Sequence, residues 1–85
     1  MRITAGRVQR GDLQVTITDP NAPRTIEIHS TVERLFGSTI ANTCKHVLDE
    51  LHIENGHFFI EDQQAFDFVI RARIRCALAR MEEHQ

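Results

Sequence analysis

The sequence predicts an α+β fold of order β-β-β-α-β-α, in which two amphipathic helices cover one face of a small, mostly antiparallel sheet. Two observations lead to this prediction. Up to about Ser30, apolar residues alternate with polar ones, as in half-buried strands. Beyond it they recur at spacings of three and four, as in amphipathic helices, with one short strand in between. With 85 residues and no linker, the chain is expected to form a single domain, 1–85.

Three strands are expected in the first part of the chain. The best defined covers 13–18, whose apolar face is made by Leu13, Val15 and Ile17. A weaker candidate covers 3–8, and a third covers 25–29, which has isoleucines at alternate positions. Because proline cannot donate to a strand ladder, the two prolines in 19–23 predict a loop there.

A tight hairpin turn is expected over 9–12, between the first two strands. Gly11 adopts a positive φ at no steric cost, as such turns require, and Arg10 lies at the tip. Arg10-Gly11-Asp12 is also a tripeptide that cell-surface adhesion receptors recognise. That match matters only in an extracellular protein, and the N-terminus lacks the apolar core of an export signal. Turn chemistry therefore explains these residues.

The first helix is expected to follow a capping box that begins at Ser30 and ends at Glu33. Its apolar stripe consists of Val32, Phe36, Ile40, Cys44, Val47, Leu48 and Leu51. Gly37 interrupts the stripe and is expected to mark close packing against a neighbouring element. Asn55-Gly56 is expected to end the helical region.

A short strand over 57–61 and a second helix over about 64–83 are expected to complete the fold. Asp62 is placed to cap this helix. The apolar stripe of the helix consists of Phe66, Val69, Ile70, Ile74, Ala77, Leu78 and Met81.

Composition excludes several classes of protein. Ten basic and twelve acidic residues give a formal charge of -2, which argues against a dedicated nucleic-acid binder. No apolar run is long enough to cross a membrane. Cys44 and Cys76 lie in helical patterns without secretory context, so they are expected to be reduced core thiols in a cytoplasmic protein.

No catalytic or metal-binding motif emerges. The five histidines form no i, i+4 pair and have no partner cysteine at zinc-finger spacing, so no metal site is expected. Arginines on the last helix admit two interpretations. Arg71, Arg75 and Arg80 form either a solubilising face, with Asp67 pairing to Arg71, or a docking surface for an acidic partner or a phosphate-bearing group. The stem of Arg73 is expected to cover the edge of the core. A separate hypothesis for the function of the chain is a small anion- or RNA-binding domain that uses Arg71, Arg75 and Arg80.

Three segments together resemble a known family. They are Ala5-Gly6 with Gly11-Asp12-Leu13 in the hairpin, the strand-to-helix segment 28–37, and the arginine-rich segment 70–80. This ordered set resembles the citrate lyase acyl carrier protein, the γ subunit of its complex. The acyl carrier of malonate decarboxylase is similar in the hairpin, so the choice between a citrate and a malonate system stays open.

The resemblance implies a carrier-type subunit that is not an enzyme by itself. Carriers of this family hold a phosphoribosyl-dephospho-coenzyme A group on a serine through a phosphodiester, and its thiol carries an acetyl thioester. The resemblance implies three partners: a transferase subunit (α) that exchanges acetyl for citrate, a lyase subunit (β) that cleaves the citryl thioester, and a prosthetic-group transferase. On this chain the corresponding site is Arg10, Gly11 and Asp12.

The chain departs from the family pattern at the attachment point. The family's serine precedes Gly-Asp, where this chain has Arg10. A guanidinium has no hydroxyl, so the prosthetic group is not expected on this chain as written. Thr16, Thr18 and Ser30 do not match the motif. Two interpretations follow: a changed carrier subunit of a citrate-lyase-like complex, or a non-carrier structural or regulatory module of such a complex.

Overall fold

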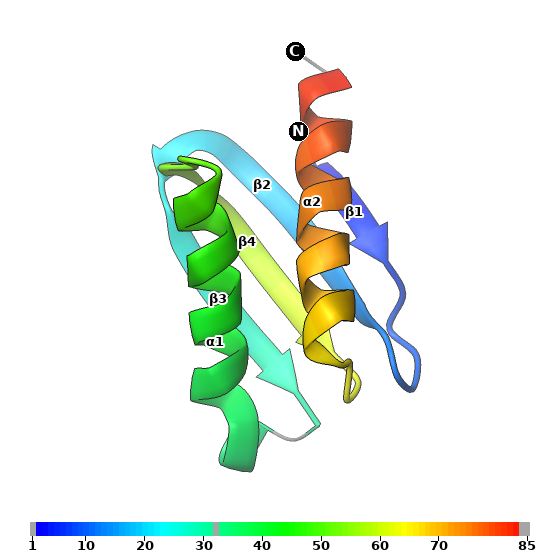
Figure 1. Cartoon of the computed structure of the whole chain (residues 1–85). Coiled ribbons are helices and arrows are strands. Elements are labelled where there is room, and N and C mark those ends of the chain that lie inside the picture. Colours follow the sequence, from blue (N-terminus) through cyan, green and yellow to red (C-terminus); the bar gives the residue numbers. More distant parts are fainter. Residues whose placement is uncertain (1, 32, 84–85) are drawn as a thin grey trace.

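A computed structural model of the chain describes residues 2–31 and 33–83, with side chains described outside 33–37. The predicted α+β order β-β-β-α-β-α is confirmed (Figure 1). The elements are β1 (Arg2–Gly6), β2 (Leu13–Pro23), β3 (Thr25–Ser30), α1 (Glu33–Glu50), β4 (Asn55–Asp62) and α2 (Asp67–Glu83).

The sheet has the strand order β1-β2-β4-β3. β2 lies antiparallel to both β1 and β4, whereas β3 lies parallel to β4 because α1 carries the chain back across the sheet. Both helices cover the same face: α1 contacts β3, and α2 contacts β1 and β2 (Figure 1). The mostly antiparallel sheet with two helices on one face is therefore confirmed.

The core lies between the sheet and the helices. Leu13, Val15 and Ile17 are at most 1% exposed, which confirms the predicted inner face of the second strand. The helices contribute buried residues at helical spacing, namely Ile40, Cys44, Val47 and Leu48 from α1 and Ile70, Ile74, Ala77, Leu78 and Met81 from α2. The alternating and helical patterns of the sequence thus meet in one apolar layer.

Two predictions about the strands are wrong. β1 ends at Gly6 and not at residue 8, because Gly6 turns the chain with a φ of 87°. The predicted loop 19–23 belongs to β2. β1 pairs with β2 no further than Thr18. A proline beyond Thr18 therefore costs no hydrogen bond with β1, although proline has no backbone N–H to donate. Asp19, with a φ of 47°, marks the irregularity there.

The bounds of the helices also differ from the prediction. α1 ends at Glu50, so Leu51 is 43% exposed and not in the core, and Asn55-Gly56 already belongs to β4. α2 begins at Asp67 because Gln64 has a φ of 63°, which a helix cannot contain. Phe66, expected in the buried stripe, is consequently 71% exposed.

Asp62 holds the turn that precedes α2. Its carboxylate accepts hydrogen bonds from the backbone N–H groups of Gln64 and Ala65 at 3.2 and 3.0 Å, and from the Ser30 hydroxyl at 2.7 Å. The prediction that Asp62 caps the helix is therefore wrong: Asp62 holds the connection before α2, because the helix begins only at Asp67. The remaining predictions around the start of α1, which concern Val32, Glu33, Phe36 and Gly37, lie outside the described side chains.

Both cysteines are free in the structure, Cys44 buried and Cys76 half-buried. Burial raises the pKa of the Cys44 thiol to about 12, so it stays protonated and unreactive at neutral pH. No helix in the described ranges is long and apolar enough to cross a membrane.

Candidate functional site at the hairpin tip

The β1–β2 connection forms a compact, exposed turn. The backbone N–H of Asp12 donates to the carbonyl of Gln9 at 3.0 Å, and Gly11 takes the positive φ of 82° that the turn needs. Gln9 and Arg10 are exposed at the tip. Residue 10 is thus presented to solvent on a turn whose own backbone hydrogen bond fixes its shape.

The turn is also attached to the connection between β4 and α2. The Gly11 N–H donates to the Gln63 carbonyl at 2.7 Å, and the Gln63 N–H donates to the Asp12 carbonyl at 2.9 Å. These reciprocal bonds join the hairpin to the β4–α2 connection, beside which it lies in Figure 1. They satisfy backbone groups that neither strand pairing nor a helix would use.

Asp12 forms the main side-chain contact of the turn. Its carboxylate accepts from Arg73 Nε at 3.0 Å and from Arg73 Nη2 at 2.9 Å, a bidentate pair, and from the Leu13 N–H at 2.8 Å. Asp12 is buried, and hydrogen bonding from the Arg73 side chain is the main cause that lowers its pKa. The same hydrogen bond raises the pKa of Arg73. A buried carboxylate needs such a partner to remain charged.

Gly6 leaves the space that this arrangement needs. A Cβ on Gly6 would lie 2.0 Å from the Leu13 carbonyl oxygen and 3.0 Å from Cδ of Arg73. By contrast, a Cβ on Gly11 would meet nothing within 4 Å. The hairpin is therefore tightly packed at its base and open at its tip.

The fold brings together residues that lie far apart in the sequence. Gly6 and Asp12 both lie against Arg73 of α2, and Gly11 is bonded to Gln63 in the connection before this helix. Sequence reasoning gave Arg73 only the role of covering the core edge. One signal in the sequence pointed to such a pair: Asp12 is an acid beside a predicted turn. That signal does not say which arginine pairs with Asp12.

The three arginines of the expected docking surface do not form one patch. Arg71 donates to Asp67 at 2.7 Å, which confirms the predicted pair, and Arg75 lies 3.6 Å from Glu50 of α1. Arg80 donates to the Thr4 carbonyl of β1. Arg71 and Arg75 thus engage acids on the helical side, whereas Arg80 lies with the hairpin.

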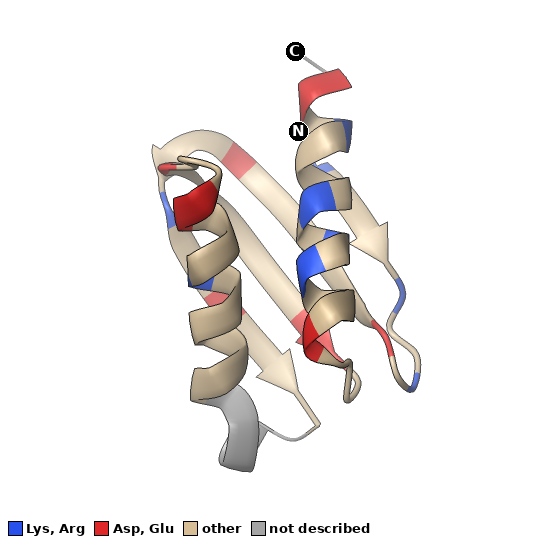
Figure 2. Cartoon of the chain, in the orientation of Figure 1, with Lys and Arg blue, Asp and Glu red and all other residues tan. Residues whose placement is uncertain are grey.

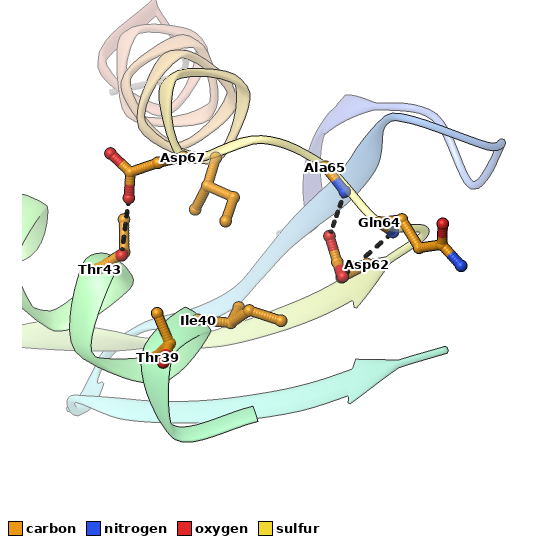
Figure 3. Close-up of a pocket in the computed structure, with 8 residues that line it drawn as sticks. Thr39, Ile40, Thr43, Asp62, Gln64, Ala65 and Asp67 are labelled. Carbon is orange, nitrogen blue, oxygen red and sulfur yellow. Dashed lines mark hydrogen bonds between the residues drawn. The ribbon is translucent and has the colours of Figure 1, made fainter. Parts of the chain in front are cut away.

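A cavity lies between the two helices, next to the same β4–α2 connection (Figure 3). It measures about 280 Å³, and Ile40, Ile70 and Ala65 contribute apolar surface to it. At its rim the Thr43 hydroxyl donates to Asp67 at 2.9 Å. Residues 64 and 65 line this cavity, and residue 63 holds the hairpin, so the connection separates the two features. In the described ranges, no three histidine, cysteine or acidic residues are grouped as a metal site would require.

Comparisons with known proteins identify the family of the chain. A family model described as malonate decarboxylase delta subunit (MdcD) matches residues 1–81. Among curated relatives, a citrate lyase acyl carrier protein of Vibrio cholerae is 42% identical over 78 residues, covering 89% of this chain and 79% of the relative. One of Treponema denticola is 38% identical over 78 residues, covering 92% of this chain and 88% of the relative.

A solved structure shares the fold. A chain from the crystal structure of a Pseudomonas malonate decarboxylase hetero-tetramer in complex with malonate superposes with a TM-score of 0.75. The match covers 94% of this chain and 82% of that chain, at 21% sequence identity. At this identity the likeness concerns the fold.

Proposed function

Because the chain belongs to the family of acyl carrier subunits that contains the malonate decarboxylase delta subunit and the citrate lyase acyl carrier protein, we propose that it takes the carrier's place in a citrate-lyase-like complex without bearing a covalent prosthetic group. One observation carries the proposal. The hairpin is complete, with the Asp12–Arg73 pair and the bonds to Gln63, but an arginine occupies its tip.

The residues present do not fit the phosphoribosyl-dephospho-coenzyme A group that the family implies. A phosphodiester requires an accessible hydroxyl, and residues 5–15 contain neither serine nor threonine. Thr16 is only 5% exposed, and the Ser30 hydroxyl is hydrogen-bonded to Asp62. Neither side chain replaces a hydroxyl at position 10.

The proposed partners are the catalytic subunits of such a complex, equivalent to the transferase (α) and lyase (β) subunits. An exposed, rigidly held tip suits a subunit that presents one point to a neighbour. Without the covalent group the chain has no catalytic role of its own in this proposal. It is a structural or regulatory member of the complex, and its cytoplasmic location stays a prediction.

Arg10→Ser tests the proposal, with Gln9→Ser as the matched control that places a hydroxyl one residue away. Each protein is incubated with a citrate-lyase prosthetic-group transferase and the activated nucleotide precursor, and intact mass is measured. We expect a mass increase for Arg10→Ser alone. Labelling of the unchanged chain would show that another hydroxyl serves and would overturn the proposal.

Assembly gives an independent test. The unchanged chain is mixed with citrate lyase α and β subunits and analysed by size-exclusion chromatography with light scattering. We expect it to co-elute with them, as Arg10→Ser does. Failure of the unchanged chain to join, while Arg10→Ser joins, would contradict a role as an unmodified member of the complex.

A further inference from the structure

A polar depression of about 510 Å³ lies at the base of the hairpin, between the β1–β2 connection and α2. It is distinct from the apolar cavity between the helices. Its lining consists of Gly6, Arg7, Gln9, Asp12, Arg73 and Arg80. The depression therefore sits directly beside the exposed tip.

The lining carries an excess of positive charge. Three guanidinium groups face one carboxylate, an excess of two charges, although the whole chain has a formal charge of -2. Arg24 and Arg71, by contrast, are each paired with one acid, Asp49 and Asp67 respectively. Figure 2 shows basic positions on the hairpin and along the neighbouring part of α2. The concentration is local and calls for a negatively charged partner.

The guanidinium groups retain hydrogen-bond donors. Arg73 uses Nε and Nη2 on Asp12, and Arg80 uses Nη1 on the Thr4 carbonyl. Each arginine has five N–H donors, so both have donors left over. For Arg7, the described contacts include a backbone bond to Leu13 at 3.1 Å, but none through its guanidinium.

Contacts with the fold hold the guanidinium groups of Arg73 and Arg80, whereas Arg7 is held through its backbone. Asp12 holds Arg73 at two points. Gly6 lets the backbone pass directly beneath this arginine, since even a Cβ at position 6 would lie only 3.0 Å from Cδ of Arg73. A planar guanidinium presents its N–H donors in a fork that matches the geometry of phosphate oxygens. A phosphate with two negative charges also balances the excess charge of the lining.

We propose that this depression binds a phosphate-bearing small molecule non-covalently, through Arg7, Arg73 and Arg80. The site holds its ligand by charge-assisted hydrogen bonds, so it needs no hydroxyl on the hairpin. The acidic balance of the chain argues for a small ligand and not for a nucleic-acid backbone. This proposal does not depend on the place of the chain in a complex.

Binding is measured on the purified chain alone by following backbone amide and arginine Nε–H signals in NMR spectra during titration with inorganic phosphate and, separately, with ADP. We expect saturable shifts at residues 6, 7, 9 and 73, weakened by added salt because the groups are partly exposed. Similar constants for the two probes identify phosphate itself as the ligand. ADP binding about tenfold tighter identifies a nucleotide. Either result supports the proposal.

Variants locate the site. Arg7→Gln combined with Arg80→Gln should weaken binding at least about tenfold, and Arg7→Gln alone about threefold, because each removes charge-assisted donors. Arg75→Gln is the matched control on the same helix, outside the depression, and should leave binding within about twofold. The double variant also loses the contact between Arg80 and the Thr4 carbonyl. The single Arg7→Gln variant keeps this contact, so its weaker binding cannot result from a change at Thr4. Non-saturable shifts for both probes, or equal losses in Arg75→Gln and Arg7→Gln, would overturn the proposal.

Discussion

Two arginines on α2, only two residues apart, form ion pairs of very different kinds. Arg71 pairs at 2.7 Å with Asp67, four residues earlier on the same helix, and the Asp67 side chain is 60% exposed. Arg73 pairs with Asp12, which is 61 residues away and whose side chain is 10% exposed. The first contact joins a helix to itself, and the second joins α2 to the hairpin. The two pairs have similar distances, but their contributions to stability differ because they differ in burial and in sequence separation.

The largest effect should come from the base of the hairpin. Gly6→Ala places a Cβ against the Leu13 carbonyl and requires a positive φ, so we expect a loss of about 3 kcal/mol or more in unfolding free energy. Gly11→Ala, with open space around it, should cost only about 1 kcal/mol for its φ. Urea unfolding measures both. Equal losses for the two variants would mean that the close contacts of Gly6 with Leu13 and Arg73 do not affect stability.

The long-range ion pair is tested next. Arg73→Met should lower the unfolding free energy by about 1–2 kcal/mol, because it leaves the Asp12 carboxylate without its charged partner while the Arg73 side chain is itself partly exposed. Arg75→Met, at an exposed contact of 3.6 Å, should change it by less than about 0.5 kcal/mol. A double-mutant cycle with Asp12→Asn isolates the pair. A coupling near zero would contradict the role given to it.

Acid should remove the contribution of this pair. Hydrogen bonding from Arg73 lowers the pKa of Asp12 below its usual 3.8 in the folded chain. The resulting stability is fully present above the unfolded-state pKa and is lost as pH falls through the lower folded-state value. NMR titration of the Asp12 carboxyl carbon should show this pKa rising in Arg73→Met. An unchanged titration would indicate that the Leu13 N–H, and not the arginine, stabilises the charge.

The smallest effect is expected at the tip. Arg10 is exposed and no described side chain depends on it, so Arg10→Ser should change the unfolding free energy by less than about 0.5 kcal/mol. Gln9→Ser should behave in the same way. Thermal unfolding of both beside the unchanged chain checks this. A larger loss for Arg10→Ser would show that the arginine supports the turn.

Sequence reasoning succeeded where the information is local. Alternation at 13–18 and helical spacing at 70–81 predicted the buried faces, because the period of a strand or a helix is written in consecutive residues. It failed where a neighbour decides the outcome. Residues 19–23 can continue β2 because its pairing with β1 extends no further than Thr18. Phe66 is exposed because the positive φ of Gln64 turns the chain before α2.

The candidate site divides in the same way. The turn at Gly11 was predictable because a tight turn leaves a local signature. The pairing of Asp12 with Arg73 was not, because four arginines on α2 were equally available in the sequence and only the packing of the helix against β1 and β2 selects one. The depression that contains Arg7 and Arg80 depends on the same packing.

The reciprocal bonds between the turn and Gln63, together with the Asp12–Arg73 pair, attach the hairpin to α2 and to the connection before it. When the tip turns towards a neighbour, α2 turns with it, and so does the core against which α2 packs. Under the proposed function, a chain without a prosthetic arm reaches a second partner site only if the whole molecule rotates or dissociates. Each contact with a partner then sets the orientation of the entire molecule. In the proposed function, the hairpin therefore presents a fixed point to its partner and does not move independently of the core.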